Sequence, residues 1–351
     1  MKKILVLIVL VLSQYSYSQD VNLTGEISDT VIVTSSRYQK NINELPYSAA
    51  IIGLDKISTA PSQSVPELLR TESGISLIRD GIWGAEINIR GLSRSNVVAL
   101  IDGNRVETSN DISARLSMID LNDIDRIEVI KGAASTLYGT GAMGGVVNII
   151  SKQDNYSNNF FLKGSLNSGY NSVNNNYLSG LNLSAGAERW TARLTGSFRR
   201  ADNTKTPAGT IANSQYKDNS LSGALNLKPL DDQELKLIFQ QFNAEDVGIP
   251  GGNGVFPANA TVRYPEERRK MFSAEYDINN ISNSLRKISA KYFYQYMLRD
   301  VENIPHQVKT VAASNGQPAK RVNVLEIDPT AEHNSYGLQF QSDFTLGSNY
   351  Y

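Results

Sequence analysis

The chain has 351 residues, with 34 Lys and Arg against 35 Asp and Glu, 40% hydrophobic residues and no Cys. The balanced charge argues against nucleic-acid binding, which needs a basic surface, and the lack of Cys excludes disulfides, thiolate metal sites and a Cys nucleophile. The negative mean hydropathy excludes a helical membrane protein but leaves open a β-barrel, whose strands need only every second residue to be apolar.

Residues 1–19 have the pattern of a secretory signal peptide. Lys2 and Lys3 precede the apolar run Ile4–Leu12, which is too short to cross a bilayer, and a small polar stretch follows up to Gln19. We therefore predict that the protein is exported and that the mature chain begins near Gln19 or Asp20.

Residues 46–152 have the pattern of a compact mixed domain. Ser64-Val65-Pro66-Glu67 matches a capping box at the start of a short helix. Asp102-Gly103, between two apolar segments, predicts a tight hairpin turn. Turn residues bound five predicted strands: Ile75–Ile78, Ile87–Arg90, Val97–Ile101, Arg126–Ile130 and Val146–Ile150.

After about residue 155 the pattern changes to segments of about ten residues that alternate apolar and polar side chains. In Glu188–Arg200, for example, Leu194 and Phe198 share one face, and Arg193 and Arg199 share the other. About eight such strands are predicted: Phe160–Ser168, Tyr177–Ala187, Glu188–Arg200, Ser220–Lys228, Glu234–Phe242, Lys270–Asn279, Arg286–Arg299 and Gly337–Leu346.

These strands are compatible with a membrane barrel or with a half-buried soluble sandwich. Their length favours the barrel, because strands of soluble sandwiches are shorter. Alternation of tight links with the long polar segments Asp202–Asp218, Glu245–Glu267 and Val301–Glu332 also favours it. Aromatic residues near strand ends could form an interfacial girdle: Tyr170, Tyr177, Trp190, Tyr216 and Tyr276.

The order of several short motifs resembles that of TonB-dependent outer-membrane receptors. The β-branched segment Asp29-Thr30-Val31-Ile32-Val33-Thr34 resembles their coupling box, the TonB box, and such an extended segment could add to the sheet edge of a partner. The alternative is that it forms the first strand of the following domain. The motifs that resemble the family's plug domain contain Arg90, Gly91, Asp102, Gly103, Arg126, Glu128, Lys131, Gly132, Tyr138, Gly139, Gly144, Gly145 and Asn148.

The resemblance implies an α+β plug domain followed by an antiparallel transmembrane β-barrel of about 22 strands. It implies location in the cell outer membrane, contact with its lipid, and energy coupling to TonB and its inner-membrane motor proteins. The predicted domains are a signal peptide (1–19), a periplasmic arm with the TonB box (20–45), the plug (46–152) and the N-terminal portion of the barrel (153–351). Eight strands are too few to enclose such a plug, so the barrel is expected to be incomplete.

In relatives, according to the same resemblance, residues matching Arg90 and Glu128 make buried or barrel-facing ionic contacts; ordinary solvated charges are the alternative here. The resemblance also assigns ligand contact to two plug loops, with Ile82, Trp83, Ser109 and Asn110 as candidates. Trp83 could stack on a planar ligand or simply pack between plug and barrel. His306 and His333 could ligate haem iron, although a lone His is more often a surface residue.

Two apparent motifs carry no function. Gly139–Gly144 spells a dinucleotide fingerprint, but a strand follows it instead of a helix, so its glycines are expected to allow tight turns and packing against a barrel wall. Asp120, Asn122, Asp123 and Asp125 lack the ligand spacing of a calcium loop, and a local cap or turn is expected. We predict no metal site and no resident cofactor, and we do not expect the protein to be an enzyme.

The function that the resemblance implies is TonB-energised import of a scarce ligand, an iron complex such as haem or a ferric siderophore, with a lean towards haem-using members. Extracellular partners would be the small ligand or a haem-carrying protein. The alternatives are import of cobalamin and a non-transporting outer-membrane binding protein or adhesin.

Overall fold

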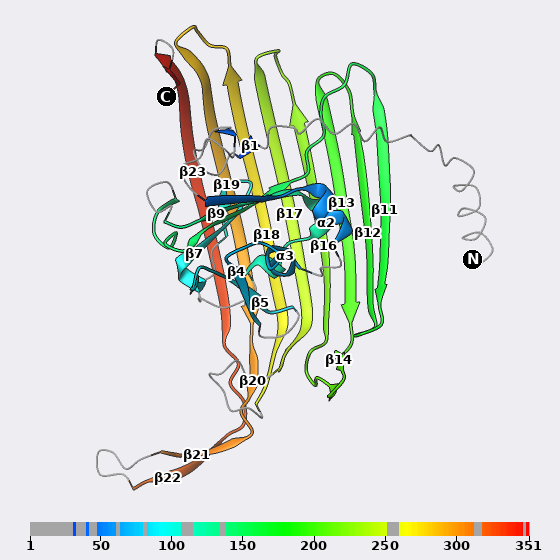
Figure 1. Cartoon of the computed structure of the whole chain (residues 1–351), viewed down its shortest axis with the longest axis vertical. Coiled ribbons are helices and arrows are strands. Elements are labelled where there is room, and N and C mark those ends of the chain that lie inside the picture. Colours follow the sequence, from blue (N-terminus) through cyan, green and yellow to red (C-terminus); the bar gives the residue numbers. More distant parts are fainter. Residues whose placement is uncertain are drawn as a thin grey trace, which may run out of the picture.

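The structure is a computed structural model that describes residues 31–32, 40–41, 48–60, 64–79, 83–106, 115–133, 138–250, 260–311, 318–346 and 349–350. Long strands from the second half of the chain stand side by side as one sheet, which we call the wall (Figure 1). The short elements of the first half, which form the plug, lie across one face of this wall (Figure 1).

The plug contains a five-stranded sheet in the order β3-β9-β10-β7-β8 and a three-stranded sheet in the order β4-β5-β6. Its strands are β3 (Ser48–Ile52), β4 (Ile75–Arg79), β5 (Ala85–Ile89), β6 (Leu92–Ser93), β7 (Val97–Ile101), β8 (Asn104–Arg105), β9 (Ile124–Lys131) and β10 (Gly145–Ser151). Its helices are α2 (Leu54–Thr59), α3 (Val65–Leu69) and the 3-10 turns η3 (Arg94–Asn96), η4 (Arg115–Ser117) and η5 (Leu121–Asp123). All five strands predicted for this region are present.

The start of α3 was predicted correctly, but its capping box was not. Ser64 is the N-cap residue, yet its side chain makes no capping hydrogen bond. The predicted Asp102-Gly103 turn is present between β7 and β8, with φ of 49° and 77°.

The wall contains the eight long strands that the sequence predicts, all antiparallel to their neighbours. They are β11 (Phe161–Asn171), β12 (Asn176–Gly186), β13 (Trp190–Ala201), β16 (Tyr216–Leu227), β17 (Gln233–Ile249), β18 (Thr261–Asn279), β19 (Leu285–Asp300) and β23 (Thr330–Leu346), with the short β24 (Asn349–Tyr350) beside β23. Within the described residues, β11 and β24 end the strand order without pairing with each other.

Three strands are longer than predicted by seven residues or more, because they continue past the alternating segments. β17 extends to Ile249 and β18 starts at Thr261, so much of the predicted loop Glu245–Glu267 is strand. β23 likewise starts at Thr330. The remaining connections carry the hairpin of β14 (Lys205–Thr206) and β15 (Gly209–Thr210), β20 (Glu302–Ile304) paired with β18, and the hairpin of β21 (Gln307–Val311) and β22 (Lys320–Val324).

The wall is polar towards the plug and apolar on its outer face. On β13, Leu194 is 50% exposed and Phe198 is 39% exposed, whereas Thr195 and Arg199 on the opposite face are buried. On β23, Leu338 and Phe340 are exposed. Such an exposed apolar band with a polar interior is the arrangement of a membrane β-barrel rather than of a soluble sandwich.

The predicted aromatic girdle is only partly supported. Tyr170 and Tyr177 are exposed, and their rings lie 4.9 Å apart at the turn between β11 and β12. Tyr216 is instead buried on the plug side, where its hydroxyl accepts from Asn176 Nδ2 at 2.6 Å. Its position in the alternation turns it inward, so it cannot lie in an interfacial belt.

One apolar core joins the plug to the wall. Ile52, Ile89 and Ile127 of the plug belong to the same buried cluster as Phe242 and Met271 of the wall. No helix within the described ranges is both long and apolar enough to cross a membrane.

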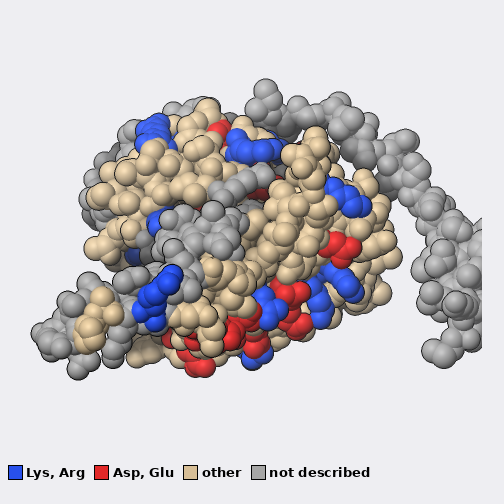
Figure 2. All heavy atoms as spheres, turned by 90° about the horizontal axis from the view of Figure 1, so that it is seen from below, with Lys and Arg blue, Asp and Glu red and all other residues tan. Residues whose placement is uncertain are grey.

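The end of the wall that carries β14 and β20 to β22 is rich in charged pairs. Viewed from this end, acidic and basic side chains lie interleaved along one side of the molecule (Figure 2). Ion pairs here join Lys217 to Glu245 and Arg263 to Glu302. We call this the long-loop end and the opposite one the short-turn end.

Candidate functional site at the plug–wall interface

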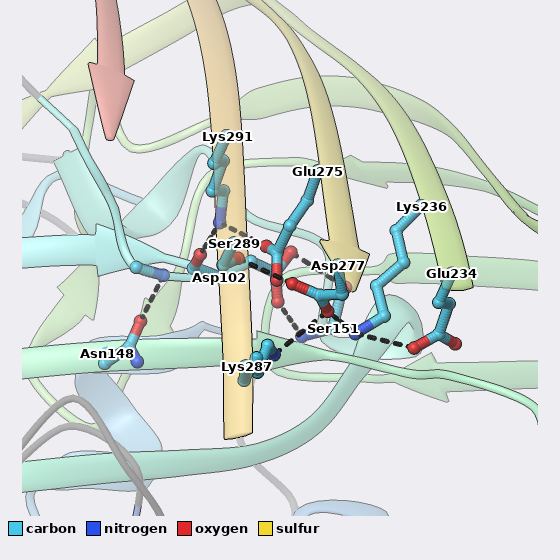
Figure 3. Close-up of polar contacts among 11 residues, drawn as sticks. Asp102, Asn148, Ser151, Glu234, Lys236, Glu275, Asp277, Lys287, Ser289 and Lys291 are labelled. Atoms are coloured by element: carbon cyan, nitrogen blue, oxygen red, sulfur yellow. Dashed lines mark hydrogen bonds and ion pairs between the residues drawn. The ribbon is translucent and has the colours of Figure 1, made fainter. Parts of the chain in front are cut away.

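The Asp102-Gly103 turn of the plug is held on two sides. Ser151 donates to the Asp102 carboxylate through its N–H and its hydroxyl, both at 2.8 Å, and Gly103 N–H donates to Asn148 Oδ1 at 3.1 Å. From the wall, Lys291 Nζ donates to the Asp102 carbonyl at 2.5 Å (Figure 3). Three residues of the predicted plug signature therefore form one contact region.

Around Lys291, three neighbouring strands present alternating charges to the plug (Figure 3). Lys291 lies 3.4 Å from Glu275, and the carboxylate of Asp277 lies 3.0 Å from Lys287 and 3.3 Å from Lys236. Because acids and bases alternate across β17, β18 and β19, each charge has an opposite neighbour, and Lys291 contacts the plug at Asp102.

Glu128 and Arg126 form an ion pair inside the plug. Glu128 is fully buried on β9 and accepts from Arg126 Nε at 2.9 Å. Arg90 is exposed and has a positive φ of 51°, and its guanidinium lies close to Gly132. Lys131, at the end of β9, is buried. Of the two residues for which the resemblance implied ionic contacts, Glu128 is thus buried with Arg126 as its partner, whereas Arg90 is exposed.

The glycines of residues 139–145 allow close approach within the plug itself. A Cβ on Gly141 would lie 2.6 Å from the Ser95 carbonyl oxygen, and one on Gly145 would lie 2.2 Å from the Ile130 carbonyl oxygen. The expectation of packing against a barrel wall is therefore wrong for these positions, because their neighbours are plug backbone. Strand β10 follows directly, which agrees with the rejection of a dinucleotide site. Tyr138, just before them, accepts through its carbonyl from Arg105.

Trp83 is buried between the plug and the wall. Its Nε1 donates to Asp218 Oδ2 at 3.1 Å, and its ring packs against Phe242 and Tyr264. Asp218 also accepts two hydrogen bonds from Arg199, each at 2.7 Å. Of the two roles predicted for Trp83, this geometry favours packing.

The segment between η4 and β9 is the densest polar contact with the wall. Asp120 caps η5 by accepting from Asn122 N–H at 3.0 Å, as expected for a local cap. Asp123 is buried and lies 3.1 Å from Arg193. Burial raises the pKa of Asp123 to about 6, although the Arg193 charge opposes this rise.

Of the predicted TonB box, the structure describes only Val31 and Ile32. They form β1 (Val31–Ile32), which pairs antiparallel with β2 (Lys40–Asn41). This pair is a sheet separate from the plug sheets. Asp29, Thr30, Val33 and Thr34 lie outside the described residues.

The other candidate ligand contacts, Ile82, Ser109 and Asn110, also lie outside the described residues. His306 Nε2 is hydrogen-bonded to Thr261 Oγ1 at 3.1 Å, and His333 lies on β23. Among the side chains that the structure describes, no group of three His, Asp or Glu residues is placed to hold a metal ion.

Sequence reasoning missed the wall partners of the plug: Arg193, Asp218, Gln240, Arg269 and Lys291. The alternation of β13 had placed Arg193 on the polar face, so its orientation could be predicted. Its partner could not, because Asp123 is seventy positions away and no local pattern links them.

Comparisons with known proteins agree with this architecture. Residues 41–146 match the family model of the TonB-dependent Receptor Plug Domain. The chain is 35% identical over 126 residues to the vitamin B12 transporter BtuB of Vibrio cholerae serotype O1, covering 35% of this chain and 21% of that protein. It is 32% identical over 153 residues to the iron-regulated outer membrane virulence protein of the same species, covering 41% and 23%.

Among solved structures, the copper transporter OprC aligns with a TM-score of 0.69 at 19% identity, covering 85% of this chain and 44% of that one. The shared fold is a plug set against the strands of an outer-membrane barrel. Residues 41–146 therefore form the plug domain of a TonB-dependent receptor, and the location of the protein is the cell outer membrane. It spans about a fifth of the length of the curated relatives that it matches.

Proposed function

We propose that this protein takes part in TonB-energised import of a scarce ligand across the outer membrane. The observation that carries the proposal is a plug that matches the receptor family and is docked on the polar face of a membrane-type wall. The long-loop end would face the outside, and the short-turn end would face the periplasm.

Energy coupling would act through the TonB box, residues 29–34. Val31 and Ile32 are already extended and paired with β2, so they have the backbone conformation that strand addition to a partner requires. Binding of TonB would replace β2 by a strand of the partner. The pull would then pass along the arm to β3, the first strand of the plug sheet.

For the ligand, we propose an iron complex, a ferric siderophore or haem, with cobalamin as an equal candidate. The iron-regulated relative supports the first, and the vitamin B12 transporter supports the second. Both matches lie in the plug and the first strands, so they bear on the coupling machinery more than on the ligand site.

The test is uptake of labelled ferric siderophores, haem and cyanocobalamin by cells with and without the gene, each in the presence and absence of TonB. We expect uptake of one ligand class that needs both. Val31→Pro removes a backbone donor from the coupling strand and should reduce uptake to the level without TonB, whereas Val21→Pro, in the same arm but outside the box, should not. Uptake that persists without TonB would favour a passive binding protein.

A further inference from the structure

One short plug segment contacts six consecutive strands of the wall. This segment, Met118–Asp123, lies just before β9 and is called the anchor below. From β11 to β18 its partners are Asn167, Gly180, Arg193, Ser220, Gln240 and Arg269. The 118–123 segment thus spans most of the described wall by itself.

The contacts of the anchor are short and mostly buried. Ser220 Oγ donates to Asp120 Oδ2 at 2.6 Å, and Gln240 Nε2 donates to Asp123 Oδ2 at 3.2 Å. Arg269 Nη2 donates to Gln240 Oε1 at 3.0 Å and its Nε donates to the Met118 carbonyl at 3.2 Å. Gln240 therefore links the Asp123 carboxylate to a second buried guanidinium.

Loss of Arg193 would leave the buried Asp123 carboxylate without its opposite charge. Such a loss costs far more than the loss of a solvated pair. The fit is also tight, because a Cβ on Gly180 would lie 2.7 Å from Asn122 Nδ2. A cavity of about 20 Å³ beside Asp120, Asp123 and Arg269 has room for one water molecule at most. The anchor is thus held by both charge and shape.

The coupling arm and the anchor are connected to two neighbouring strands of the plug sheet, the arm to β3 and the anchor to β9. The arm leads into β3, an edge strand whose described partner is β9 alone, over the register Ser48–Ile52 to Lys131–Ile127. A pull on β3 therefore acts on β9, and the anchor, which directly precedes β9, contacts the wall.

We propose that Met118–Asp123 is the fixed point of the plug, which stays on the wall while the pull on the arm displaces the β3 edge. Asp123 and Arg193 are then positioning residues for transport. This inference rests on the proposed function for its transport arm, but the docking that it describes can be measured without any ligand.

The first experiment uses disulfide locks between positions of this chain, whose 351 residues contain no Cys. Asn122→Cys with Gly180→Cys would lock the anchor to β12, and Ala50→Cys with Val129→Cys, which are register partners, would lock β3 to β9. Oxidation should leave TonB-dependent uptake unchanged with the anchor lock and abolish it, reversibly by reductant, with the edge lock. Loss of uptake with the anchor lock, or none with the edge lock, would overturn the proposal.

The second experiment needs neither ligand nor TonB. Arg193→Met should raise the passive entry of a large antibiotic roughly tenfold or more, as expected for more than 1.4 kcal/mol of lost docking. Arg189→Met is the matched control, because Arg189 forms an exposed pair with Asp231. The double variant Asp123→Ala with Arg193→Ala should leak less than Arg193→Ala alone, because it removes the buried carboxylate together with its partner. Entry at the wild-type rate in the single variants would contradict the anchor even if the receptor imports nothing.

Discussion

Asp123 shows how a single buried side chain can make plug docking depend on pH. Burial raises its pKa to about 6, Arg193 and Ser222 from the wall oppose the rise, and Asp120 and Asp102 from the plug add to it. A carboxyl group with a raised pKa binds its proton more tightly in the docked state. The stabilisation that protonation of Asp123 adds to docking is therefore complete below its usual value of 3.8 and is lost as the pH rises through about 6.

We therefore expect the plug to resist release by urea more strongly at pH 5 than at pH 7.5, by about 1 kcal/mol. The measurement is the urea midpoint at which the plug becomes sensitive to protease in outer membranes. Asp123→Asn should remove this pH dependence, whereas Asp125→Asn, at a side chain that is 42% exposed, should preserve it. An unchanged pH dependence in Asp123→Asn would assign it to another group.

At the scale of elements, the paired strands β13 and β16 contact the plug through side chains on their inner face. Arg199 and Asp218 form a buried, doubly hydrogen-bonded pair that also binds Trp83 of the plug. Lys217, which directly precedes Asp218 on β16, lies on the opposite face of the strand. It forms an ion pair with Glu245 in which both side chains are about half exposed. Substitutions at Asp218 and Lys217 therefore compare the loss of a buried ion pair with the loss of an exposed one at adjacent positions in the wall.

Asp218→Ala should lower the stability of the folded receptor by about 3–5 kcal/mol, because it removes the carboxylate that forms two hydrogen bonds with the buried Arg199 guanidinium. Lys217→Ala should cost about 0–1 kcal/mol, because its pair is solvated. Both can be measured as shifts of the urea midpoint for the folded band on a semi-native gel. Equal shifts in the two variants would show that Arg199 finds another partner or becomes hydrated.

The alternation of apolar and polar residues predicts the positions of the wall strands, but it misplaces the ends of β17 and β18. The sequence predicted all eight long strands, because each has an apolar face over at least part of its length. It stopped β17 and β18 too early, since the alternation of buried residues shifts by one position between Ala244 and Val247 and between Tyr264 and Glu267, while the backbone pairing continues. Backbone hydrogen bonds, not side-chain pattern, set the ends of these strands.

At the scale of the whole molecule, the exposed apolar face of the wall should lie in lipid. Leu338 is 69% exposed near the middle of β23, whereas Ser335 lies on the inner face and is only partly exposed. A charge on the outer face must enter the hydrocarbon, while a charge on the inner face meets polar groups.

Leu338→Arg should therefore lower the stability of the receptor in bilayers by about 2–4 kcal/mol, and Ser335→Arg by much less. Urea titration of the folded band in lipid vesicles measures both. If the two variants were equally stable, the outer face would not be in contact with hydrocarbon.

The sequence by itself determined the order of the parts, the positions of the strands and the two faces of each strand. The motifs of residues 90–148 are local, and alternation with a period of two is a property of neighbouring residues. Only the tertiary structure decided which face lies inside and which plug residue meets which wall residue. Asp123 finds Arg193, and Trp83 finds Asp218 across 135 positions, because the plug packs against the polar face of the wall and buries charges that must be paired there.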